Sequence, residues 1–158
     1  QKSESMTKKP RIFVGSSTEG LAVAKLLQLE MDYDAEVTLW SQGVFGLSGG
    51  TLETLVKAAA AFDFAVLVLT PDDVVTKREK EKNAPRDNVL FELGLFMGAL
   101  GRERTYIVHP RVPIDLPTDL AGVTPATYEP NRADGNLHSA IGPAATRILT
   151  EVKKLGCR

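Results

Sequence analysis

Short apolar stretches rich in β-branched residues alternate along the chain with segments that place apolar residues at helical spacing. The short stretches are Arg11–Gly15, Glu36–Trp40, Phe64–Leu69, Thr105–Val108 and a weaker one at Val123–Tyr128. Two-sided apolar runs of this length are typical of strands buried in a parallel sheet. We expect the last of them to lie at the edge of the sheet, because Pro125 does not suit a central strand.

The segments between these strands predict helices. Apolar residues line one face of three of them: Leu21, Ala24, Leu27 and Met31; Leu52, Leu55, Val56, Ala59 and Ala60; and Ile141, Ala144, Ile148 and Val152. The last set lies in a helix predicted over Leu137–Leu155, where Gly142 and Pro143 predict a kink or a restart near the first turn. Asn88–Leu100 is apolar on nearly every side, so we expect this helix to be buried.

The alternation of strand and helix favours an α/β domain with a parallel sheet that is covered on both faces. We predict a flavodoxin-like fold, a three-layer sandwich around roughly five strands. Ligands in such folds bind beyond the carboxyl ends of the strands, where the strand order reverses. This rule indicates three loops as candidate sites: Gly15–Gly20, Ser41–Thr51 and Pro71–Asn88.

Composition narrows the class of protein further. The 158 residues suffice for one domain. We expect Gln1–Ser5, which precede Met6, to be a cloning remnant, and residues 6–158 to form that domain. Lys and Arg number 19 against 20 acidic residues, so we expect no nucleic-acid partner. Val89–Gly101, the longest apolar run, is too short to span a bilayer, so we expect no membrane partner. A single cysteine, Cys157, fits a reducing cytoplasmic location.

The first candidate loop offers unpaired backbone N–H groups at a helix start, where an anion is favoured. Its candidate binding residues are Ser16 and Ser17. The loop lacks both the Lys of a Walker loop and the glycine spacing of the dinucleotide fingerprint. An alternative is a capping box, since Ser16 and Glu19 stand three residues apart; Ser17 would then remain available to a ligand.

The second and third loops carry further candidates. Four glycines beside Trp40 and Phe45 indicate either a lid, whose aromatic rings could stack on a flat ligand, or side chains that tuck onto the sheet. Asp72 follows Pro71 at a strand end and is either a turn residue or a ligand for ribose hydroxyls. The two histidines lie far apart in the sequence, and no Cys or acidic pair has metal-ligand spacing, so we expect no metal site.

Glu92 is the only ionisable residue between Val89 and Gly101. Burial of a carboxylate is costly unless the group is paired, and burial raises its pKa. Asp87 is a suitable N-cap for this helix, which places Glu92 in the second turn. From the residues alone, Glu92 is either a catalytic carboxylate or a buried acid that pairs with an arginine and holds a loop in place.

Several segments together resemble a known family. They are Arg11–Ser17, Gly43–Phe45, Thr51–Glu53, Phe62–Val66 with Pro71–Asp73, Asp134–Leu137 and above all Arg86–Phe96. On these segments the chain resembles the bacterial TIR domain of anti-phage cyclic-nucleotide effectors, such as the TIR-STING proteins of CBASS systems and the Pycsar TIR effectors. The likeness extends over the whole domain, and the combined motif is specific although no single piece of it is.

The resemblance implies an NAD+ hydrolase that cuts the bond between nicotinamide and ribose and depletes NAD+ in abortive infection. It places the catalytic glutamate at Glu92, with NAD+ as substrate and no cofactor. Many TIR enzymes carry a tryptophan four residues before this glutamate, whereas this chain has Asn88, so Phe45 or Trp40 would supply the aromatic face. Ser16 and Ser17 would hold the nicotinamide end or a phosphate of NAD+. The pocket mouth would be shaped by Arg86 and Asp87.

The resemblance also implies partners. Such TIR domains associate with one another when a cyclic-nucleotide sensor, fused or separate, oligomerises. We expect this chain to be the TIR part of a longer effector with a C-terminal sensor domain. Two alternatives remain: a non-catalytic TIR module that only self-assembles, and a nucleoside deoxyribosyltransferase-like enzyme in which Glu92 is the nucleophile.

Overall fold

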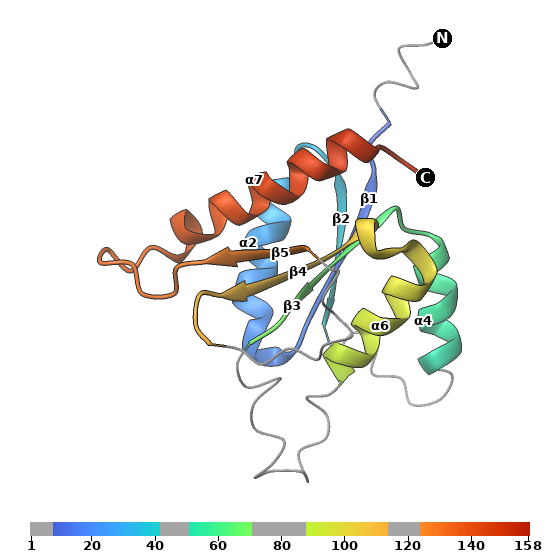
Figure 1. Cartoon of the computed structure of the whole chain (residues 1–158), viewed down its shortest axis with the longest axis horizontal. Coiled ribbons are helices and arrows are strands. Elements are labelled where there is room, and N and C mark those ends of the chain that lie inside the picture. The colour runs from blue at the N-terminus through green and yellow to red at the C-terminus, as the bar shows by residue number, and fades with distance from the viewer. Residues whose placement is uncertain (1–7, 42–50, 71–87, 114–123) are drawn as a thin grey trace, which may run out of the picture.

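The computed structural model describes residues 8–41, 51–70, 88–113 and 124–158 (Figure 1). Within these ranges the strands form one parallel five-stranded sheet in the order β2-β1-β3-β4-β5. Their bounds are β1 Arg11–Ser16, β2 Glu36–Ser41, β3 Phe64–Val68, β4 Thr105–Pro110 and β5 Thr124–Tyr128. The predicted parallel sheet is confirmed, and so is the place of the fifth strand at its edge.

Helices cover both faces of the sheet, which confirms the three-layer sandwich (Figure 1). Their bounds are α2 Leu21–Met31, α4 Thr51–Ala60, α6 Asn88–Leu100 and α7 Leu137–Leu155, with short 3-10 turns η1 Thr18–Gly20 and η3 Arg102–Arg104. One core lies under α2 and α7, and a second lies under α4 and α6. Of the described helices, none is both long enough and apolar enough to cross a membrane.

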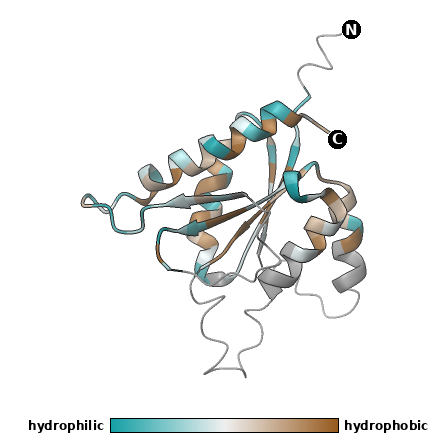
Figure 2. Cartoon of the chain, in the orientation of Figure 1, coloured by the Kyte–Doolittle hydropathy of each residue, from teal (hydrophilic) through white to brown (hydrophobic). Residues whose placement is uncertain are grey.

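Alternate residues of the central strands face these two cores, as the two-residue period of a strand requires. Ile12 and Val14 of β1 lie in the core under α2 and α7, whereas Phe13 between them lies in the core under α4 and α6. Every residue of β3 is buried, so both faces of this strand are apolar. Figure 2 shows the hydrophobic positions concentrated on the central strands and on the helix sides that face them.

The outer faces of α4 and α6 differ from the prediction. Phe96 and Leu100 of α6 are buried, but Gly94, Gly98 and Ala99 are exposed, so the part of this helix from residue 94 to residue 100 is covered on one side only. In α4, Ala59 is buried while Ala60 is exposed and Val56 is 51% exposed. A helix in the outer layer of a sandwich has the sheet on one side alone, and apolar composition all round does not change that geometry.

The last helix, α7, begins and continues more simply than expected. Asn136 is its N-cap and accepts a hydrogen bond from the backbone N–H of Ser139 at 2.9 Å. A turn precedes the helix: Gly135 has a positive φ of 67°, and its N–H donates to the carbonyl oxygen of Arg132 at 3.0 Å. A hydrogen bond from the Arg132 side chain holds the pKa of Asp134 well below its ordinary value. The helix does not restart at Pro143; this residue lies inside one continuous helix.

Tyr106 of β4 links burial to a pH dependence of stability. Its side chain is 2% exposed, and its hydroxyl donates a hydrogen bond to the Glu103 carbonyl oxygen at 2.9 Å. Burial, helped by the negative charge of Glu151, raises the pKa of Tyr106 from 10.0 to about 12. Because the folded pKa lies above the unfolded one, this contribution to stability is complete below pH 10.0 and is lost as the pH rises through about 12.

We therefore expect the free energy of unfolding to fall less steeply above pH 10.0 in Tyr106→Phe than in the wild type. At neutral pH the substitution should cost about 1 kcal/mol for the lost hydrogen bond. Urea denaturation at a series of pH values measures both effects. Tyr33→Phe is the control, because Tyr33 is 87% exposed and should follow the wild type. Equal slopes for the wild type and Tyr106→Phe would contradict the expectation.

Candidate active site

The strand order reverses between β1 and β3, which makes the carboxyl ends of these strands the expected ligand edge. From β1 the chain passes to β2 on one side and later to β3 on the other, so the connections leave β1 in opposite directions. Ser16, the last residue of β1, pairs in register with Ser41 of β2 and Val68 of β3. The topology thus places the Gly15–Gly20 loop at the switch point of the sheet, where open α/β folds bind their ligands.

Two serine hydroxyls are buried at this edge of the sheet. Ser16 is 4% exposed and Ser17 is 5% exposed, and neither Oγ atom has a partner among the described residues. A buried polar group left in this way costs about 1–3 kcal/mol, so native structures satisfy nearly all of them. Two such hydroxyls on adjacent residues at the switch point are suited to a polar ligand group.

The capping box expected for Ser16 and Glu19 is wrong. The 3-10 turn η1 separates Ser16 from α2, whose N-cap is Gly20 and carries no side-chain cap hydrogen bond. The turn closes instead through the backbone, since the N–H of Gly20 donates to the carbonyl oxygen of Ser17 at 3.1 Å. The serine hydroxyls are therefore not used to begin the helix.

Gly20 presses this turn against the end of β3. A Cβ atom at Gly20 would lie 3.0 Å from Cγ1 of Val68 and 3.4 Å from both Cγ2 of Thr70 and Cβ of Ser16. Thr70, which is 9% exposed, therefore lies beside the serines at the edge. Thr70 is not among the site residues predicted from the sequence; its position directly after the apolar run that forms β3 was the available signal.

An aromatic cluster supports the edge from the α6 side of the sheet. The ring of Phe13 stacks on Phe96 at 4.3 Å between centroids and contacts Trp40 at 5.2 Å and Phe62 at 5.6 Å. Trp40 is 8% exposed and belongs to this core. Trp40 therefore packs onto the sheet, as one of the two alternatives predicted. Its stacking on a ligand stays a prediction.

Phe96 also fixes how α6 is oriented against the sheet. The helix begins at Asn88 on the carboxyl side of β3 and returns the chain to the start of β4. Position 92 lies four residues before Phe96, one helical turn nearer to the carboxyl edge. The side chain of Glu92 lies outside the described part of the structure, as do the candidate residues Phe45, Asp72, Arg86 and Asp87.

The two histidines lie on β4, near its carboxyl end, and on α7. Nδ1 of His109 lies 2.8 Å from the carbonyl oxygen of Pro110. Nε2 of His138 on α7 pairs with the carboxylate of Glu30 on α2. Across residues 8–41, 51–70, 88–113 and 124–158, no three His, Cys, Asp or Glu side chains are grouped so as to hold a metal ion. The described groups of the edge include the neutral hydroxyls of Ser16 and Ser17, backbone N–H groups and the exposed carboxylate of Glu19 in η1.

Comparison with known proteins gives consistent matches. The family model of the TIR domain of CAP12/Pycsar effector proteins matches residues 11–130. The Pycsar effector protein PaPycTIR of Pseudomonas aeruginosa is 42% identical over 147 residues, which cover 92% of this chain and 48% of that protein. CD-NTase-associated protein 12 of Flavobacterium daejeonense is 45% identical over 121 residues, which cover 77% of this chain and 39% of that protein.

The matches differ in how much of each relative they cover. The chain spans about half the length of the Pycsar relatives, 48% of PaPycTIR and 49% of BcPycTIR of Burkholderia cepacia. The crystal structure of a prokaryotic SEFIR domain superposes with a TM-score of 0.54 over 93% of this chain and 90% of that chain. Its sequence is 10% identical, so this likeness supports the fold alone.

Proposed function

Because the chain belongs to the TIR-domain family of CAP12/Pycsar effector proteins, we propose that it hydrolyses NAD+ at the bond between nicotinamide and ribose. The observation that carries the proposal is the pair of buried hydroxyls of Ser16 and Ser17 at the topological switch point, which have no hydrogen-bond partner within the described residues. A dinucleotide offers the carboxamide and phosphate oxygens that such hydroxyls bind. The first turns of α6, which contain position 92, begin at the same carboxyl edge of the sheet, on the face opposite α2.

The reaction suits a site with one essential carboxylate. Most glycosidases need two carboxyl groups, because a poor leaving group must be protonated while the other face of the sugar is attacked. The nicotinamide of NAD+ is a cationic pyridinium and departs as a neutral molecule, so no general acid is required. Glu92 has to be ionised to stabilise the positive charge that develops on the ribose, and this stabilisation is stronger where water is excluded. Water then completes the hydrolysis and releases ADP-ribose.

The other residues have supporting roles in the proposal. Ser16 and Ser17 bind the nicotinamide carboxamide or a phosphate, together with the N–H groups of the η1 turn. Phe45 or Trp40 contributes an aromatic face, Asp72 binds ribose hydroxyls, and Arg86 with Asp87 shapes the mouth of the pocket. The ring of Trp40 packs against that of Phe13, with 5.2 Å between the centroids, and this contact holds the Trp40 ring in position.

Replacement of Ser16 and Ser17 is expected to affect stability and activity in different ways. Changing both Ser16 and Ser17 to Ala should leave the free energy of unfolding unchanged or raise it by about 1–2 kcal/mol, because two unpartnered hydroxyls leave the interior. The same change should lower kcat/KM for NAD+ about tenfold for each hydrogen bond lost to the substrate. Ser139→Ala, on the exposed side of α7, is the control and should change neither quantity. Loss of stability without loss of activity would assign the serines a structural role.

The test of the proposed function is nicotinamide release from NAD+ over a range of protein concentrations, with the protein free and clustered on beads. We expect release that rises more steeply than the protein concentration and increases on clustering, as self-association of TIR domains requires. The alternative of a non-catalytic module predicts no release in either form. The deoxyribosyltransferase alternative predicts a covalent deoxyribosyl adduct on Glu92 with deoxynucleosides, which mass spectrometry detects.

For the whole effector we propose a role in anti-phage defence through depletion of NAD+. The relatives named Pycsar effectors and CD-NTase-associated proteins are about twice as long as this chain, which leaves room in those proteins for a second domain. In the proposal that domain senses a cyclic nucleotide and assembles the TIR domains. Phage challenge of cells that produce the full-length effector, with and without Glu92→Gln, tests this role: only the wild type should deplete NAD+.

A further inference from the structure

Gly20 follows the two serines of the candidate active site, and its backbone conformation does not require glycine. It is buried, ends the η1 turn and is the N-cap of α2. Its φ of −97° and ψ of 5° are accessible to residues that carry a side chain. The described glycines with a positive φ are others: Gly101, Gly135 and Gly156. What position 20 requires is therefore space.

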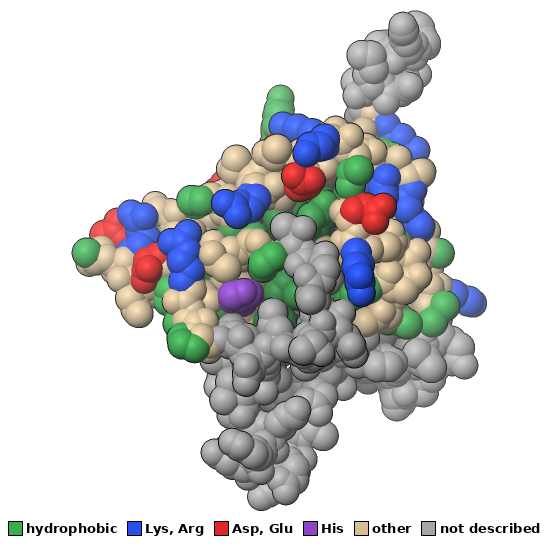
Figure 3. Space-filling view, in the orientation of Figure 1, with side chains coloured by type: hydrophobic (Ala, Val, Ile, Leu, Met, Phe, Trp, Pro, Cys, Tyr) green, Lys and Arg blue, Asp and Glu red, His purple; other side chains and the backbone are tan. Residues whose placement is uncertain are grey.

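Three side chains surround the place where a Cβ atom of residue 20 would lie. This atom would be 3.0 Å from Cγ1 of Val68 and 3.4 Å from both Cβ of Ser16 and Cγ2 of Thr70. Carbon atoms in contact are best separated by about 3.5–4.0 Å, so a methyl group fits here only if something moves. The three neighbouring atoms are carbons, and a methyl group adds no charge, unlike the Lys, Arg, Asp and Glu side chains on the surface in Figure 3. The effect of an added methyl group is therefore steric.

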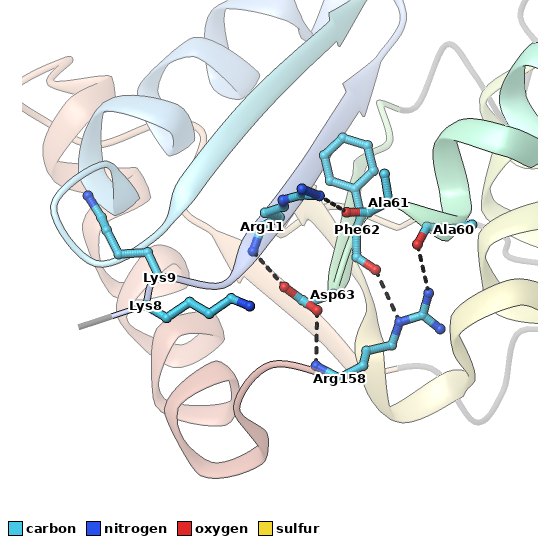
Figure 4. Close-up of a pocket in the computed structure, with 8 residues that line it drawn as sticks. All are labelled: Lys8, Lys9, Arg11, Ala60, Ala61, Phe62, Asp63 and Arg158. Carbon is cyan, nitrogen blue, oxygen red and sulfur yellow. Dashed lines mark hydrogen bonds between the residues drawn. The ribbon is translucent and has the colours of Figure 1, made fainter. Parts of the chain in front are cut away.

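The ends of β1 and β3 are held in place. Val68 ends β3, is 0% exposed and pairs in register with Ser16 of β1. Its β-branched side chain has a restricted χ1 angle, so Cγ1 does not turn aside easily. At the other end of these strands, the N–H of Arg11 donates to Oδ2 of Asp63 at 2.9 Å, and Nη1 of Arg11 donates to the Ala61 oxygen at 2.7 Å (Figure 4). The two strands are thus tied to each other at both ends.

The η1 turn is the part that would move. The N–H of Gly20 donates to the carbonyl oxygen of Ser17 at 3.1 Å, so a displacement of residue 20 is passed on to Ser17. Relief of the contacts around a Cβ atom here takes a few tenths of an ångström. Hydrogen bonds between oxygen atoms span only about 2.5–3.0 Å, so a displacement of this size weakens any bond that the serine hydroxyls make.

We propose that Gly20 is a positioning residue of the candidate active site. The absence of a side chain at position 20 lets the η1 turn lie against the end of β3. This contact holds the hydroxyls of Ser16 and Ser17 where the substrate meets them. The inference rests on the proposed function, in which these serines bind NAD+. Because they bind the substrate and do not react with it, a displaced turn raises KM and leaves kcat little changed.

The test compares Gly20→Ala with the wild type in two measurements. One is steady-state release of nicotinamide from NAD+, and the other is calorimetric titration with carba-NAD+, in which a methylene replaces the ribose ring oxygen so that the bond is not cleaved. We expect KM for NAD+ and Kd for carba-NAD+ to rise about tenfold, the size of one lost hydrogen bond, with kcat within about twofold. Gly142→Ala on α7 is the matched control and should change none of these, because a Cβ atom there meets nothing within 4 Å.

A second substitution in β3 tests the steric cause. Val68→Ala removes Cγ1, the atom nearest to the added methyl group. Gly20→Ala combined with Val68→Ala should therefore bind carba-NAD+ within about twofold of Val68→Ala alone. Combined with Val66→Ala, a change in the same strand and core, Gly20→Ala should still weaken binding about tenfold. If variants with Val68→Ala do not fold, Thr70→Ser, which removes Cγ2 and keeps the hydroxyl, should restore part of the affinity.

The outcomes separate this inference from the proposed function. A folded Gly20→Ala that binds carba-NAD+ as tightly as the wild type overturns the positioning role, and so does equal restoration by Val66→Ala and Val68→Ala. Absence of carba-NAD+ binding by the wild type also overturns it. The expected binding pattern without nicotinamide release would contradict the proposed hydrolysis and leave the role of Gly20 in place. Nicotinamide release with the same KM in Gly20→Ala and the wild type would contradict the role of Gly20 alone.

Discussion

Replacement of Glu92 by Gln is expected to lower the rate of nicotinamide release from NAD+ by at least about 100-fold. Removal of one preorganised group that stabilises charge in a transition state typically costs a factor of about 10²–10³. Glutamine keeps the size and the hydrogen-bonding capacity of the side chain but cannot oppose the positive charge on the ribose. Nicotinamide release under the clustered conditions that give the highest wild-type rate is the measurement.

The controls for Glu92→Gln separate catalysis from folding. The free energy of unfolding should change little, because the substitution removes a charge from an otherwise apolar helix and preserves the volume. Glu103→Gln, on the exposed η3 turn beyond the other end of α6, should keep full activity. Retained turnover by a folded Glu92→Gln would remove Glu92 from the catalytic role.

Replacement of Phe13 by Ala is expected to lower the free energy of unfolding by about 3–5 kcal/mol, the usual cost of truncating a buried phenylalanine. Phe13 is 0% exposed and stands at the centre of the aromatic cluster, in contact with Trp40, Phe62 and Phe96. Its loss leaves a cavity between the central strand and α6 that close-packed neighbours cannot fill. Urea denaturation at neutral pH measures the change.

The matched control is Tyr33→Ala, which removes another aromatic ring. Tyr33 is 87% exposed, so its loss should change the free energy of unfolding by about 0.5 kcal/mol or less. A milder substitution, Phe13→Leu, should fall between the two because it fills part of the cavity. A cost for Phe13→Ala as small as that for Tyr33→Ala would contradict the central place of this ring in the core.

Much of the fold could be predicted because local patterns reflect burial. Strands that are apolar on both faces occur only where both sides are covered, and the helix faces of α2 and α7 follow directly from their periodicity. For α4, Val56 and Ala60 were predicted on the buried face, but Val56 is 51% exposed and Ala60 is exposed as well. Alanine-rich segments mark no sharp boundary between faces, because alanine is tolerated on either side.

The site was only partly accessible to sequence reasoning. Ser16 and Ser17 were selected from their place after a strand, but the missed contact with Thr70 depends on Gly20 packing against β3, which no local pattern encodes. The capping box failed because a 3-10 turn and a capped helix start share the same residue types.

The most direct test of an NAD+ site at the switch point is the crystal structure of Glu92→Gln soaked with NAD+, which this variant should bind without turnover. We expect the dinucleotide at the carboxyl ends of β1 and β3, with an oxygen of its carboxamide or phosphates within hydrogen-bond distance of Oγ of Ser16 or Ser17. The nicotinamide ribose should lie beside residue 92. NAD+ bound on another face, with both hydroxyls still unpartnered, would contradict the assignment of this edge as the active site.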